Sequence, residues 1–143
     1  MTTTGGAERR IDLTKMGEGR YKATNARGGV LPVGSGGDPD FTPVELLLAA
    51  LAGCGAIDID LITGKRAEAT TFDVTAAGEK IRDDQGNRLV DLRVTFDVRF
   101  PEGEDGDRAR EVMPRAIAQT RDRLCTVGRT IKAGAEITYG EAR

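Results

Sequence analysis

One stretch of this sequence, TPVELLLAALAGCGAIDIDLITG, constrains the fold most, because it predicts a single long apolar helix. Thr42 suits the N-cap, Pro43 suits the first helical position, and Glu45 completes a T-x-x-E capping box. We expect the helix to run from Pro43 to about Thr63 and to end before Gly64 in the C′ position.

This helix is expected to be buried on all sides, because the run Leu46–Ala52 is apolar around the whole helix. A chain of 143 residues has too little other structure to surround a helix of about twenty residues. We therefore expect a homodimer. The longest apolar stretch, Leu46–Ile57, is too short to span a bilayer, so no membrane association is expected.

Composition excludes several classes of function. The chain has no histidine, which excludes His-based acid–base catalysis, Cys/His nucleophile pairs and His-ligated metals. Its 21 basic and 23 acidic residues are interspersed, which argues against nucleic-acid binding. Two cysteines cannot form a four-ligand zinc site, and the N-terminus does not resemble a signal peptide. We expect a soluble, cytoplasmic protein without a metal.

The rest of the chain predicts strands and one further helix. The acidic segment 101–107 is expected to form a turn, and Pro114 is expected in the first turn of the next helix or as a kink. The chain length suits one domain over 1–143, with 1–9 as a flexible tail. The expected elements are two or three strands in 10–33, the central helix, strands over 71–81 and 89–100, a helix over 111–125 and a strand over 135–140. The order β-β-β-α-β-β-α-β indicates an α+β fold with antiparallel sheets.

The cysteine of the central helix, Cys54, allows two interpretations. It is either a small buried apolar residue or a reactive thiol. Its place in mid-helix denies it the depressed pKa that helix N-termini give, so activation would need a nearby cation. The second cysteine, Cys125, follows 71 residues later, and the spacing alone does not bring the two together.

Together these motifs resemble the OsmC/Ohr family, the osmotically induced protein C and organic hydroperoxide resistance proteins. The resemblance runs from about Ile11 to Tyr139 and rests on the Gly-rich loop, TPVELLLAALAGC, the following AIDID and the second cysteine. It is closest to the OsmC-like branch. It implies an intertwined homodimer whose antiparallel sheets wrap around two central helices, with active sites at the subunit interface. Gly53 and Gly55 would then allow close approach to the thiol.

The resemblance also implies a reaction. Family members reduce organic peroxides with thiols, as part of the response to oxidative stress. Cys54 matches the position that attacks the peroxide and becomes a sulfenic acid, and Cys125 matches the position that condenses with it to a disulfide. This chemistry implies no cofactor. It requires a dithiol reductant that the sequence does not identify.

Two further site residues are carried over from the family. The arginine that favours the thiolate matches Arg20, with Arg27 as the alternative; either is otherwise an exposed turn arginine. The family's glutamate after the helix proline is replaced by Val44. Glu45 is next in line, but one residue rotates a helical side chain by about 100°, so Glu45 is either a catalytic residue or only a capping residue.

Apolar walls from Leu47, Leu51 and Phe41, beside Cys54, would suit an alkyl or lipid hydroperoxide. The competing hypothesis is a non-catalytic dimeric module that binds a small hydrophobic ligand or acts as a slow redox switch. Val44 in place of the glutamate favours it.

Three charged sites are interpreted without catalysis. Asp58 and Asp60 point to different faces of the helix, so we expect exposed or interface residues and no metal pair. The cluster 121–123, Arg-Asp-Arg, is expected to be a solvated helix face.

Overall fold

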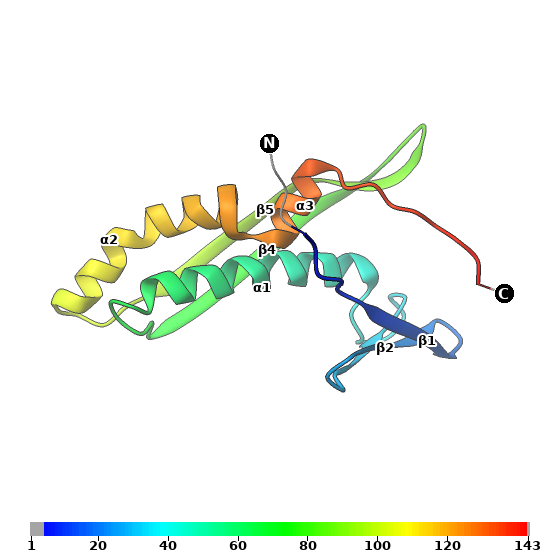
Figure 1. The fold of residues 1–143 in the computed structure, drawn as a ribbon, viewed down its shortest axis with the longest axis horizontal. Coiled ribbons are helices and arrows are strands. Elements are labelled where there is room, and N and C mark those ends of the chain that lie inside the picture. The colour runs from blue at the N-terminus through cyan, green and yellow to red at the C-terminus, as the bar shows by residue number, and fades with distance from the viewer. Residues whose placement is uncertain (1–4, 143) are drawn as a thin grey trace. The chain divides into compact units, whose positions relative to one another are not determined.

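The structure is a computed structural model that describes residues 5–142. By its internal contacts the chain divides into two compact units, one up to Leu47 and one from Leu48 onwards. Figure 1 shows the elements of both. The expectation of one domain stays a prediction. Of the expected tail, 1–4 lie outside the described residues, and 5–10 form no regular secondary structure.

The first unit contains a three-stranded antiparallel sheet, as the sequence predicts. Its strands are β1 (Ile11–Gly17), β2 (Arg20–Asn25) and β3 (Val30–Val33), in the order β1-β2-β3. The turn between β1 and β2 contains Gly19, whose φ of 67° is a left-handed value that glycine adopts more readily than other residues. A loop over 34–41 then leads to the long helix.

The predicted helix α1 is present as Pro43–Thr63. Its capping box forms: the Thr42 N–H donates to Glu45 Oε1 at 2.9 Å, and the Glu45 N–H donates to Thr42 Oγ1 at 3.3 Å. Gly64 follows the helix, where a Cβ would lie 2.6 Å from the Asp60 carbonyl oxygen, so this position has no room for a side chain.

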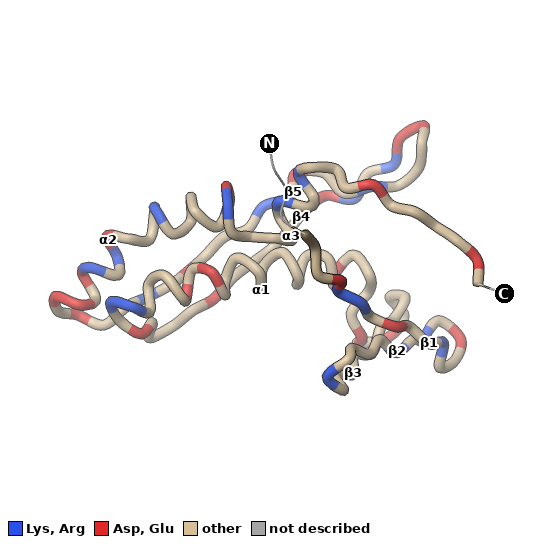
Figure 2. The backbone as a smooth tube through the Cα atoms, in the orientation of Figure 1, with Lys and Arg blue, Asp and Glu red and all other residues tan. Residues whose placement is uncertain are grey.

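The expected burial of α1 is not found within one chain. Only Gly55, Ile59 and Thr63 are buried, while Ile57 and Leu61 are 64% and 66% exposed. Figure 2 shows that most of the helix carries no charge. Over its full length α1 would pass for a membrane span by length and composition alone, contrary to our expectation from the shorter apolar run. The core helix of a soluble protein passes the same test, so this evidence is weak.

In the second unit, β4 (Thr71–Asp83) and β5 (Gly86–Arg99) form a long antiparallel hairpin. From Leu92 to Val98, half-buried apolar side chains alternate with exposed ones along β5, as the sequence predicts. The register shifts between Ala77 and Glu79, and Asp91 on the opposite strand has a φ of 54°. This β-bulge divides the hairpin into a base and an extended tip.

The helical segments after the hairpin differ from the prediction. Helix α2 spans Glu104–Gln119 and so includes most of the expected acidic turn, because acidic side chains in the first turn stabilise a helix N-terminus. Pro114 consequently lies inside α2 and not in its first turn. The expected single helix to Cys125 is instead α2 followed by a π-helical segment, η1 (Thr120–Leu124).

The C-terminal part also differs. A short helix that the sequence analysis missed, α3 (Thr126–Ala133), follows Cys125, and Gly134 ends it with a φ of 64°. The strand expected over 135–140 is absent, since these residues have no regular secondary structure. The α+β class and the antiparallel sheets are confirmed; the terminal strand is wrong.

Candidate active site

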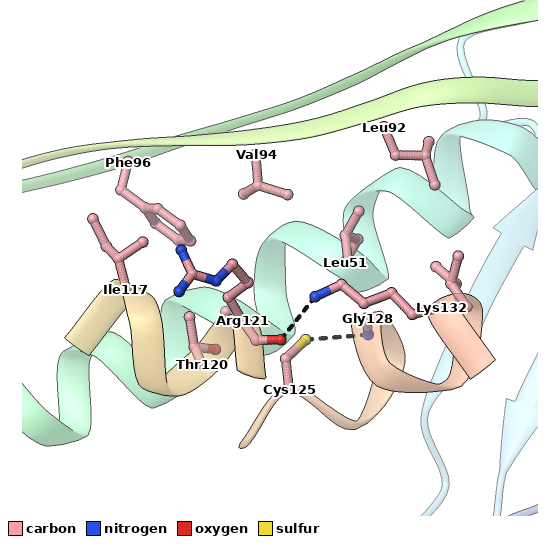
Figure 3. Close-up of a pocket in the computed structure, with 12 residues that line it drawn as sticks. Leu51, Leu92, Val94, Phe96, Ile117, Thr120, Arg121, Cys125, Gly128 and Lys132 are labelled. Atoms are coloured by element: carbon pink, nitrogen blue, oxygen red, sulfur yellow. Dashed lines mark hydrogen bonds between the residues drawn. The ribbon is translucent and has the colours of Figure 1, made fainter. Parts of the chain in front are cut away.

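The second unit contains an apolar cavity of about 410 Å³. Figure 3 shows its walls, which come from α1, β5, the end of α2, η1 and α3. One cysteine, Cys125, contributes to the wall, and Cys54 does not, contrary to the expectation that Cys54 faces the pocket. The lining residues are Leu51, Gly55, Leu92, Val94, Phe96, Ile117, Thr120, Arg121, Cys125, Gly128, Ile131 and Lys132.

Cys125 is held at the junction of η1 and α3. Its backbone N–H donates to the Thr120 carbonyl oxygen at 3.0 Å, closing the last turn of the π-helix. Its Sγ accepts a hydrogen bond from the Gly128 N–H at 3.3 Å, so the sulfur caps the N-terminus of α3 (Figure 3). The residue is only 5% exposed.

The two thiols influence one another despite their separation in sequence. Both cysteines are free, with Cys54 half-buried on α1 and Cys125 buried. Burial raises the pKa of the Cys125 thiol, and hydrogen bonding with the Cys54 side chain raises that pKa further; the Gly128 N–H opposes both effects. Cys125 is therefore kept as a neutral thiol beside Cys54.

The glycines flanking Cys54 have different surroundings. A Cβ on Gly55 would lie 2.9 Å from Cζ of Phe96, so the glycine allows the Phe96 ring to pack closely against α1. A Cβ on Gly53 would meet no atom of the described chain within 4 Å. The expected role in close approach holds within the protomer for Gly55 and not for Gly53.

A polar contact joins α1 to η1 next to the thiols. The Thr120 hydroxyl donates to Asp58 Oδ2 at 2.7 Å, and Thr120 is 4% exposed. Asp58 is half-buried and not exposed, and the alternative that it lies at a subunit interface stays a prediction. Asp60 is exposed, as expected.

Two cationic residues lie on the cavity wall. Arg121 pairs with Asp122 at 2.7 Å, and Lys132 Nζ donates to the Arg121 carbonyl oxygen at 3.0 Å (Figure 3). The residues of the cluster 121–123 are all exposed, as expected, and Arg121 also contributes to the cavity wall. Within residues 5–142, no three side chains of metal-ligating type gather together. The absence of a cofactor stays a prediction.

The other predicted site residues belong to the first unit. Arg20 lies at the start of β2 and pairs with Asp38 at 3.8 Å and Asp40 at 3.5 Å. Arg27 lies in the next turn, where its backbone N–H donates to Asn25 Oδ1 at 3.1 Å. The structure therefore gives both arginines local roles, and a catalytic role for either stays a prediction.

Glu45 is engaged by the capping box through its Oε1 atom. This supports the capping interpretation, and its catalytic role stays a prediction. Of the three expected apolar wall residues, Leu51 lines the cavity, while Leu47 and Phe41 belong to the first unit. The sequence analysis missed Thr120, and no local pattern marks it. Asp58 could have been found, because it lies one helical turn after Cys54 and therefore on the same face of α1.

Comparison with known proteins identifies relatives along most of the chain. A family model described as "OsmC-like protein" matches residues 35–140. Uncharacterized proteins of Mycobacterium tuberculosis and Mycobacterium bovis are 31% identical over 127 residues, covering 87% of this chain and 90% of theirs.

Solved structures show the same fold. A hypothetical protein from Aquifex aeolicus VF5 has a TM-score of 0.72 at 16% identity, covering 90% of this chain and 89% of that one. An OsmC-like protein from Mycoplasma pneumoniae has a TM-score of 0.68 at 14% identity, covering 88% of each chain.

Proposed function

Because this chain belongs to the OsmC-like protein family, we propose that it reduces organic hydroperoxides with its two cysteines. The observation that carries the proposal is that the side chain of Cys54 interacts with that of Cys125, 71 residues away in sequence, and that Cys125 lines an apolar cavity.

The proposed roles follow from burial. Attack on a peroxide requires a thiolate, and the raised pKa of Cys125 keeps that residue protonated. Cys54, the more exposed thiol, is therefore the attacking residue and Cys125 the resolving residue. Arg20, or alternatively Arg27, is proposed as the cation that favours the Cys54 thiolate.

The reaction has two steps. The Cys54 thiolate attacks the O–O bond, forming the sulfenic acid and releasing an alkoxide that takes up a proton to become an alcohol. The Cys125 sulfur then attacks the sulfenic sulfur, the S–S bond forms, and the S–O bond breaks to release water. An external dithiol reductant reduces the disulfide and completes the cycle.

The cavity supports the substrate class. Its apolar side chains favour an alkyl group by about 25 cal/mol for each Å² buried, so organic hydroperoxides are expected to react faster than hydrogen peroxide. We further propose that the protein is a cytoplasmic homodimer that acts in oxidative stress.

A mass measurement tests the proposal. Reduced protein treated with one equivalent of cumene hydroperoxide is expected to lose two hydrogens per chain through a Cys54–Cys125 disulfide. Cys125→Ser is expected to accumulate a sulfenic acid on Cys54 that dimedone traps, whereas Cys54→Ser leaves Cys125 unoxidised over the same interval.

The competing function is a module that binds a small hydrophobic ligand, and the observation that favours it is that Cys54 does not line the cavity. If both thiols of the folded protein stay free after excess organic hydroperoxide, the peroxidase proposal is wrong and the binding module takes its place.

A further inference from the structure

Thr120 connects the two elements that carry the thiols. Its side-chain hydroxyl donates to Asp58 Oδ2 of α1 at 2.7 Å, although 62 residues separate the two. Its carbonyl oxygen accepts the Cys125 N–H at 3.0 Å. One buried residue thus bonds to Cys125 through its backbone and to α1 through its side chain.

Asp58 lies one helical turn after Cys54. Residues four apart share a face of an α-helix, so Asp58 and Cys54 both face η1. The contact is a hydrogen bond from a buried hydroxyl to a carboxylate, and such bonds to charged acceptors are stronger than neutral ones. In the part of the chain that the structure describes, every buried side-chain polar atom has a hydrogen-bond partner, so losing this one would leave a group unpaired.

We propose that Thr120 and Asp58 form a positioning pair that holds Cys125 against Cys54 for disulfide formation. The inference rests on the proposed function in one respect: the Cys54–Cys125 disulfide is an intermediate of the proposed peroxidase cycle. Two sulfurs bond when their side chains are held in a narrow geometry, and such orientation makes an intramolecular step far more favourable than a bimolecular one. Neither residue gives or takes a proton in this role.

The test uses glutathione and needs no peroxide. Oxidised glutathione supplies the oxidising equivalent: one molecule is reduced to two glutathione thiols as the two protein thiols become the disulfide. The equilibrium constant of this exchange measures how well Cys125 is placed against Cys54. Intact-mass measurement after acid quenching gives the reduced and disulfide forms directly.

Thr120→Val keeps the shape of the side chain and removes the donor, so its equilibrium constant is expected to fall by roughly tenfold. Thr120→Ser restores the hydroxyl and is expected to return close to the wild-type constant. Asp60→Asn is the matched control: it alters an exposed carboxylate two residues from Asp58 and is expected to change nothing.

Asp58 gives an independent pair of variants. Asp58→Asn retains an oxygen that accepts from Thr120 and is expected to stay near wild type, while Asp58→Leu is expected to fall as Thr120→Val does. If the two residues act together, the double variant Thr120→Val/Asp58→Leu falls no further than either single variant.

The outcomes separate this inference from the proposed function. Equal constants for wild type, Thr120→Val and Asp58→Leu would overturn the positioning pair, as would independent, additive losses. With peroxide, Thr120→Val is expected to slow the conversion of the Cys54 sulfenic acid to the disulfide more than it slows the formation of the sulfenic acid. If peroxide gives no disulfide in wild type and no sulfenic acid in Cys125→Ser, but the glutathione constants shift as stated, the peroxidase proposal fails and the positioning pair stands.

Discussion

The residues around Cys54 show how closely α1 is fitted to its neighbours in the protomer. Gly55 faces Phe96 of β5 with no space for a methyl group, and Gly53 faces open space. Adding a methyl group at each position therefore compares a crowded site with an open site on the same helical turn.

Gly55→Ala is expected to lower the free energy of unfolding by roughly 1–3 kcal/mol, because overpacking displaces neighbouring side chains. Gly53→Ala adds the same methyl group where no atom of the described chain lies within 4 Å, and is expected to cost less. Urea denaturation measures both, and Phe96→Leu should recover part of the Gly55→Ala loss. Equal losses for the two alanine variants would contradict the packing argument.

The buried thiol of Cys125 links stability to pH. Burial, then contact with Cys54, raises its pKa above the ordinary value of 9.0. The unfolded thiol therefore ionises first as pH rises, so the stabilisation is fully present below about pH 9 and is lost through the folded pKa. Under reducing conditions, the stability advantage of wild type over Cys125→Ala is expected to shrink as the pH rises through about 9 and above. An advantage that is constant across that range would count against the linkage.

How much of the site can be predicted depends on how far apart in the sequence the interacting residues lie. The two cysteines are singled out by a family pattern, and the capping role of Glu45 follows from residues three apart. The contact between Asp58 and Thr120 joins residues 62 apart, and no local pattern reports such a pairing. The clash that makes Gly55 necessary likewise depends on a strand more than forty residues away.

At the scale of elements, local patterns place strands and α1 well and the C-terminal helices poorly. The alternation of apolar residues along β5 and the capping box of α1 both depend only on residues close together in the sequence. The bounds expected for the helix over 111–125 are wrong at both ends. Its start lies among acidic residues whose composition is also typical of a turn, and its last residues form a π-helical segment. The strand expected over 135–140 has alternating residues but no partner strand among the described residues.

The start of α1 provides a prediction at this scale. Thr42→Ala is expected to lower the free energy of unfolding by about 1 kcal/mol, because the N-cap oxygen that accepts the Glu45 N–H is lost. Glu45→Gln is expected to cost less, since its amide oxygen can still accept from the Thr42 N–H. Urea denaturation measures both, with the exposed Glu68→Gln as control.

The same variants distinguish the two roles considered for Glu45. If Glu45 only caps the helix, Glu45→Gln forms the peroxide-induced disulfide at the wild-type rate. A large loss of that rate with unchanged stability would assign Glu45 to catalysis.

At the scale of the whole molecule, the exposed face of α1 requires an explanation. Ile57 and Leu61 lie one turn apart and are both largely exposed, on a helix with few charges (Figure 2). Burial of two such side chains contributes about 1.5–3 kcal/mol each. We therefore propose that this face is covered by the same helix of a second copy.

Sedimentation of the wild-type protein at low micromolar concentration is expected to show one species near twice 15.3 kDa. Ile57→Arg places a charge in the proposed interface and is expected to give the monomer, whereas Ile57→Leu preserves the dimer. A wild-type protein that sediments as a folded monomer would defeat the proposal.

The cap of α3 has a practical consequence. A sulfur atom, and not the usual oxygen, accepts the Gly128 N–H, so the electron density around this amide proton depends on what Cys125 is bonded to. Thiol, thiolate and disulfide should each give the Gly128 amide a different NMR chemical shift. A single glycine resonance would then follow the chemical state of the protein in real time, without a label or a quench.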